Sequence, residues 1–196
     1  MSGSTPTLHP AQNRGLRELY ATARNLAGHW EALAPRFDGA AAKALAQGAG
    51  RAQALMDELP SALEPHNLYV GGAARRAGAS ISGLRTGIGD RFLERNQALR
   101  AAVLDAQHVV TLLGYQAELA ETQGTHDIAE LCHRWEHEMA ATERAARRAA
   151  VRLGRDPAAA LERMDDSAAG RAAHRAAYLV GAVGEWIDRR SGAREG

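Results

Sequence analysis

The side chains of this sequence that could bind a metal ion or transfer a proton are histidines and carboxylates on expected helices. His108 lies on an apolar side of one helix, with Asp105 three residues before it, and Glu138 lies one turn from Trp135 on the inner side of the next. Imidazole nitrogens and carboxylate oxygens are metal ligands, so Asp105, His108 and Glu138 form a candidate site if the two helices face each other. A buried, hydrogen-bonded His–Glu pair is the simpler interpretation, because so few ligands leave an iron or zinc ion incompletely coordinated.

A second group of potential ligands follows one line of a single helix, at i, i+4, i+7 and i+11. It consists of His126, Glu130, His133 and His137. Because this line is opposite the apolar residues Leu131 and Trp135, we expect it to face solvent or another subunit. It could capture zinc or nickel adventitiously or make a pH-sensitive contact, but an ordinary exposed helix face is the interpretation that we favour.

Motifs for nucleotide binding, serine hydrolysis and thiol redox chemistry do not occur: there is no G-x-x-x-x-G-K-[ST], no G-x-S-x-G and no C-x-x-C. Cys132 is the only cysteine, so neither a disulfide framework nor a cysteine-dependent active site is expected, and a reducing cytoplasm fits best. The first residues contain no apolar run, so we expect neither a signal peptide nor a membrane-spanning segment.

The formal net charge of +1 gives no overall reason to expect nucleic acid or an anionic membrane as a partner. The charges are unevenly distributed, with seven acidic residues and one arginine between Gln116 and Glu143, but eleven arginines and seven acidic residues from Arg144 onward. Solvated helix faces, complementary between subunits, explain this distribution better than a dedicated nucleic-acid-binding patch.

Alanine and leucine dominate the sequence, whereas β-branched and aromatic residues are scarce, so we expect an all-α protein. Apolar residues at spacings of three and four, with capping residues and prolines at the ends, define the expected helices. They span 13–35, 38–60, 90–124, 127–154, 156–164 and 167–190. Gly124 stands where a helix ends in a left-handed conformation, and Asp127 with Glu130 matches a capping box.

Residues 13–190 form one expected domain between disordered ends at 1–12 and 191–196. Within it, the stretch 61–89 is rich in glycine and too long for a hairpin turn, and compact domains rarely use such connections without a topological reason. A long crossover allows the third long helix to run parallel to the second. We therefore expect a four-helix bundle with a long crossover and additional C-terminal helices.

The expected helix 90–124 carries apolar residues on two sides. One stripe is Leu99, Val103, Val110, Leu113 and Ala117, and the other is Leu104, His108, Leu112, Tyr115 and Leu119. Such a helix must be covered on both sides, so the second stripe should pack inside the bundle, against the helix 167–190 or against a subunit. On the helix 38–60, Gly48 and Ala52 should let a neighbouring backbone approach closely.

The hairpin sequence Gly114–Gly124 and Leu131–Glu143, with the short-long-short order of connections, resembles the ferritin-like superfamily, and within it the bacterial stress-associated bundles of unknown function. The resemblance implies two metal ions, held by a glutamate from each of two helices and a Glu-x-x-His from each of the other two. The sequence departs from this pattern on the first two helices, whose inward positions carry alanine, glycine and leucine. The potential ligands that lie off the apolar stripes there are Glu18, His29, Glu31, Asp57 and Glu58.

These observations predict a ferritin-like bundle without a complete di-metal site or other cofactor, which acts by binding a partner or as a structural, stress-associated component. We expect a homodimer, and an enzymatic role is not favoured. The alternative is a metal-binding ferritin-like oxidase or storage protein, with iron or manganese at an atypical site around His108 and Glu138.

Overall fold

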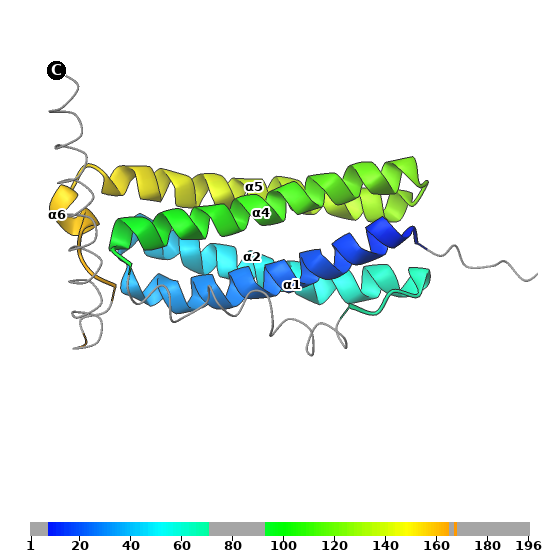
Figure 1. Cartoon of the computed structure of the whole chain (residues 1–196), viewed down its shortest axis with the longest axis horizontal. Helices are drawn as coiled ribbons and strands as arrows, with labels where there is room; N and C mark the ends of the chain where they lie inside the picture. The colour runs from blue at the N-terminus through cyan, green and yellow to red at the C-terminus, as the bar shows by residue number, and fades with distance from the viewer. Residues whose placement is uncertain (1–7, 71–92, 165–166, 168–196) are drawn as a thin grey trace, which may run out of the picture.

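The structure, a computed structural model, describes residues 8–70, 93–164 and 167, most of which form four long helices packed side by side (Figure 1). The long helices are α1 (Pro10–Leu33), α2 (Gly39–Leu63), α4 (Arg95–Thr122) and α5 (His126–Leu153). Two short 3-10 helices, Ala34–Arg36 and Glu64–His66, follow α1 and α2, and the short helix α6 (Pro157–Ala160) follows α5. The described ranges contain no strand, so the expected all-α class is confirmed.

Neighbouring long helices run antiparallel. Helix α1 turns back into α2 through a short connection, and its contacts with α4 also run in opposite directions: Gly15 lies against Gln116, whereas His29 binds Asp105. Helix α4 therefore runs parallel to α2, as expected, and begins at the end of the bundle opposite to the one where α2 ends (Figure 1). Of the expected crossover, 71–89 lies outside the described residues, as do the expected final helix beyond residue 167 and the tail.

Two helices extend further than the sequence predicts. Helix α1 begins at Pro10, within the N-terminal stretch expected to be disordered, because His9 Nδ1 accepts a hydrogen bond from the Ala11 backbone and proline fits the first turn. Helix α2 continues through Pro60 to Leu63. A proline removes one backbone hydrogen bond, and the next turn compensates by burying Leu63 completely.

The cap of α4 is Glu94 rather than the expected Asp90, which lies outside the described residues. The Glu94 and Gln97 side chains each accept from the other's backbone N–H, which is a capping box. The capping box expected for α5 is wrong: Thr125 stands at the N-cap, its hydroxyl accepts no hydrogen bond from the first turn of the helix, and Asp127 binds His66 at 2.7 Å. Gly124 has the expected left-handed conformation, with φ +70°.

Helix α6 is shorter than the expected 156–164. Asp156 caps it by accepting from the Ala159 backbone at 3.0 Å. The chain then leaves the helix to pair with the start of α4, where Met164 N–H donates to the Leu93 carbonyl at 3.1 Å and Arg95 N–H donates to the Glu162 carbonyl at 2.8 Å. Backbone pairing with another element therefore replaces the last turn that the local sequence predicts.

The four helices enclose one apolar core, in which the expected stripes of α1 and α5 are largely buried. Gly48 was expected to let a neighbouring backbone approach α2, but the Trp30 side chain fills the space beside it instead. A Cβ there would lie 2.2 Å from Cζ3 of Trp30, an indole with no exposed surface. Trp30 thus crosses the core and packs on the bare backbone of α2. No described helix is long and apolar enough to cross a membrane.

Candidate functional site

The three residues of the candidate metal site do not converge. Asp105 Oδ2 binds His29 Nδ1 at 2.6 Å, and Glu138 Oε2 pairs with an arginine on α2, Arg51, at 3.4 Å. His108 Nε2 lies 3.8 Å from an α1 glutamate, and about half of its side chain is exposed. Within the described ranges, no three His, Cys, Asp or Glu side chains are grouped so that they could hold a metal ion.

His108 lies outside the bundle because α4 buries a different line of residues. The fully buried line passes through Ala106, Val109 and Leu113. His108 precedes Val109 by one residue, which rotates it about 100° around the helix axis, away from the core. The sequence pattern placed both apolar stripes of this helix under cover. The described helices bury most of the first stripe, but they leave Leu104, His108 and Tyr115 of the second exposed.

The contact between His29 and Asp105 ties α1 to α4, and only 9% of the His29 side chain is exposed. The sequence placed His29 off the apolar stripe of its helix, which is correct, but it gave no indication of a partner 76 residues away. A histidine beside a carboxylate that it hydrogen-bonds is held in one ring orientation. The contact therefore fixes the two helices relative to each other.

A buried polar layer closes the other end of the α1–α4 contact. Gln12 Nε2 donates to Thr125 Oγ1 at 2.7 Å, and that hydroxyl donates to the Ala120 carbonyl at 3.2 Å. The fully buried amide of Gln116 packs on Gly15, where a Cβ would come within 2.0 Å of its nitrogen. Both glutamines sit in line with apolar core residues, which is the sequence signal that could have identified this layer.

Charged side chains also join α2 to α5. Glu58 accepts from Trp135 Nε1 at 2.9 Å and forms an ion pair with Arg134, whose guanidinium stacks on the Trp135 ring. The hydrogen bond from Arg134 holds the pKa of Glu58 below its ordinary value, against the opposing effect of partial burial. The ionised Glu58 carboxylate therefore helps to hold α2 against α5.

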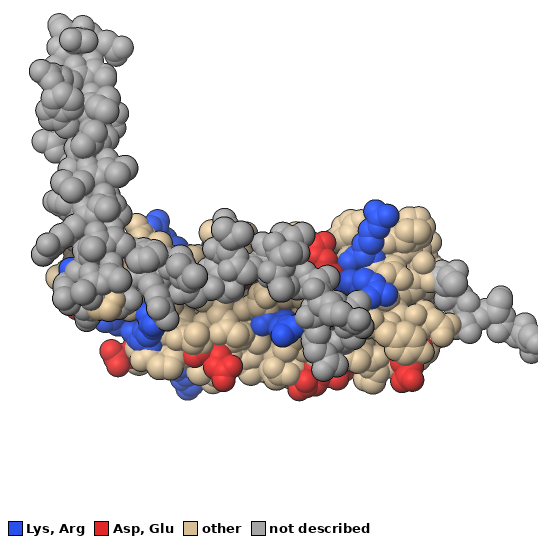
Figure 2. Space-filling model, turned by 60° about the horizontal axis from the view of Figure 1, so that its bottom comes forward, with Lys and Arg blue, Asp and Glu red and all other residues tan. Residues whose placement is uncertain are grey.

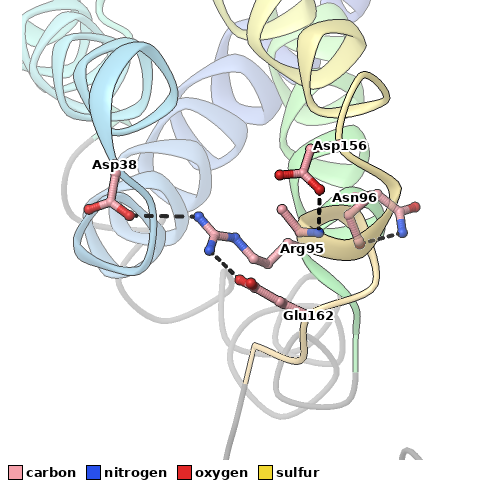
Figure 3. Close-up of polar contacts among 7 residues, drawn as sticks. Asp38, Arg95, Asn96, Asp156 and Glu162 are labelled. Atoms are coloured by element: carbon pink, nitrogen blue, oxygen red, sulfur yellow. Dashed lines mark hydrogen bonds and ion pairs between the residues drawn. The ribbon is translucent and has the colours of Figure 1, made fainter.

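At the start of α4, Arg95 connects three segments of the chain. Figure 3 shows its guanidinium between Asp38 at the start of α2, 3.9 Å away, and Glu162 beyond α6, 2.6 Å away. The guanidinium also stacks on the Phe37 ring, 5.1 Å from its centre. The neighbouring Asn96 donates to the Ala160 carbonyl at 2.8 Å. These contacts attach the chain after α5 to the end of the bundle.

The line of histidines on α5 is exposed, as the sequence predicts. All four members, His126, Glu130, His133 and His137, lie on the surface. His133 Nε2 binds Glu121 at 2.9 Å, and this hydrogen bond raises the pKa of His133, with Glu136 and Glu118 adding to the effect. The neighbouring glutamates of α4 and α5 thus favour the protonated form of this imidazole.

Acidic and basic side chains are interspersed along the face that Figure 2 presents, where neither sign forms a continuous patch. The arginines of the second half of α5 are exposed, and one of them, Arg147, binds Glu143 on the preceding turn. By contrast, the outward side of α4 exposes two large apolar side chains, Leu104 and Tyr115. Tyr69, Val151 and Leu161 are also exposed, but Leu104 and Tyr115 lie on the same side of one long helix.

No protein-family model matches the chain, and no curated protein or solved structure is significantly similar to it.

Proposed function

We propose that the protein is a ferritin-like helical bundle that lacks a complete di-metal centre and acts by associating with a protein partner or as a structural component. The topology supports the ferritin-like part of this proposal. Two antiparallel hairpins, α1–α2 and α4–α5, are joined so that α2 and α4 run parallel, which is the arrangement of bundles with one long crossover.

The observation that carries the proposal is the chemistry of the bundle interior. The described side chains with the least exposed surface are mostly leucine and alanine, with the Trp30 indole among them. The buried polar ones are Gln12, Gln116, Thr125, Thr142 and Glu143. The carboxylate among them, on Glu143, binds Arg147. A di-metal centre requires several inward carboxylates and two histidines at one level, and the interior residues that the structure describes offer no such set.

The alternative, a metal-binding oxidase or storage protein, draws less support from the geometry. Its atypical site would combine His108 with Glu138, but their charged partners are on different helices, Glu18 on α1 and Arg51 on α2. Bringing the two side chains together would require breaking both contacts and repacking α4.

Elemental analysis of full-length protein purified without a histidine tag tests the proposal. We expect well under one iron or manganese ion per chain, and the same value for the variant His108→Ala. Two tightly bound ions per chain would refute the proposal. Loss of these ions in His108→Ala, with unchanged helical content by circular dichroism, would establish the alternative.

A further inference from the structure

The outermost line of side chains on α4 is complementary to the same line of a second copy that runs in the opposite direction. Its exposed members, in chain order, are Arg100, Leu104, His108, Thr111, Tyr115 and Glu118. At 3.6 residues per turn, these positions fall within an arc of roughly 80°, so they form one continuous line, called here the α4 stripe. It is basic at one end, acidic at the other, and has a large apolar side chain next to each end.

The apolar members set a register for self-association. Leu104 and Tyr115 expose 60% and 54% of their surface and are three turns apart, about 16 Å along the helix. If two α4 helices pack antiparallel, Leu104 of each copy can contact Tyr115 of the other. The same register places His108 opposite Thr111, and Arg100 opposite Glu118 to within one residue. In this one register, each apolar residue faces an apolar residue, each polar residue faces a polar one, and each charge faces its opposite.

We propose that the α4 stripe is the contact between two copies of this chain, packed antiparallel about a two-fold axis that passes between His108 and Thr111. The proposal rests on the proposed function, because it names the partner of a bundle that acts by association. A two-fold axis makes one patch serve both subunits, so the patch must be complementary to itself, as the α4 stripe is.

The charges oppose a parallel pairing of two stripes. In a parallel pair, Arg100 would face Arg100 and Glu118 would face Glu118, and like charges in contact oppose association. An unrelated partner protein would not require that the stripe match its own reverse. The order of basic, apolar, polar, apolar and acidic residues therefore favours a second copy of the chain as the occupant.

Charge-reversal variants of the full chain provide the test, with the dissociation constant measured by light scattering over a range of concentrations. Arg100→Glu and Glu118→Arg should each weaken self-association about tenfold or more, because each reverses two symmetric ion pairs per dimer. Mixing the two variants should restore association, since each charge then meets its opposite. Arg148→Glu, on the exposed part of α5, makes the same charge change away from the stripe and should have no effect.

A second variant tests the apolar part of the contact. Leu104→Asp should abolish the dimer while leaving the circular dichroism spectrum unchanged, because Leu104 is exposed and contributes little to the core. A wild-type chain that is monomeric at all concentrations would overturn the inference without affecting the proposal of a metal-free bundle. A dimer insensitive to Leu104→Asp, or single variants that do not recover on mixing, would overturn it as well.

Discussion

Replacing Gly48 with alanine should destabilise the protein, although alanine is the better helix former. A Cβ at this position would lie 2.2 Å and 2.3 Å from two carbons of the Trp30 ring, and 2.7 Å from Cγ2 of Thr142. Trp30 and Thr142 are both buried, so neither can move away into solvent. The added methyl group must therefore push α2 outward or force the indole out of its preferred orientation.

The expected size follows from two opposing contributions. Overpacking a core typically costs about 1–3 kcal/mol, and contacts this short with a rigid ring place Gly48→Ala toward the upper end. The gain in helix propensity from glycine to alanine offsets roughly 1 kcal/mol. The net loss should be about 1–2 kcal/mol. Gly50→Ala is the matched control. No atom outside the local helix backbone lies within 4 Å of the place where its Cβ would be, so this variant should be about 1 kcal/mol more stable than the wild type.

Urea and thermal unfolding of the full chain, followed by circular dichroism, measure both variants. For a protein of this size, 1 kcal/mol corresponds to a shift in Tm of about 2–4 °C, so the two variants should move the midpoint in opposite directions. In the background of Trp30→Leu, Gly48→Ala should lose most of its effect, because the two residues are in contact. If Gly48→Ala proved as stable as Gly50→Ala, the packing of Trp30 on α2 would be wrong.

Three further measurements test individual contacts. Because the pKa of Glu58 is lowered, its contact with Arg134 stabilises the fold above the ordinary glutamate pKa and is lost as the pH falls through the folded value. Glu58→Gln should therefore flatten the acid side of the unfolding midpoint plotted against pH, and an unchanged profile would disprove the contact. Glu121→Gln should lower the raised pKa of His133 in an NMR titration, whereas no change would show that the hydrogen bond does not form in solution. Burial raises the pKa of the Cys132 thiol to about 12, so a thiol reagent should modify the native protein only as fast as it unfolds, and rapid modification without urea would contradict this burial.

The helices with one apolar side were the easiest to predict from the sequence. On α1 and α5, apolar residues at spacings of three and four lie on a single side, and the structure buries nearly all of them. The ends were less predictable, because a local rule can be outweighed by a distant partner. Pro60 does not end α2, since burying Leu63 favours another turn, and Asp127 does not form a capping box, since it binds His66.

The contacts that join the helices could not be predicted in the same way. Helical periodicity places His29 off the apolar stripe of α1, but it does not reveal which helix lies beside that residue. The partner, Asp105, belongs to a helix 76 residues later in the chain. The prediction that His108 lies inside the bundle was wrong for the same reason. It rested on the pattern of one helix, which does not show which side of that helix the bundle covers.

The two-sided pattern of α4 connects the fold to the proposed function. A helix at a corner of a four-helix bundle packs against its neighbours along one side, and α4 does so through its alanine-rich line, with small side chains that allow close packing. Its two large exposed apolar side chains, Leu104 and Tyr115, lie off that line and present apolar surface to water. The described helices leave them exposed, so burying them needs a further surface, which the proposed self-association would supply. The described interior is filled mostly by leucine and alanine and by the Trp30 indole. The self-association proposed above would therefore use the outer face of α4.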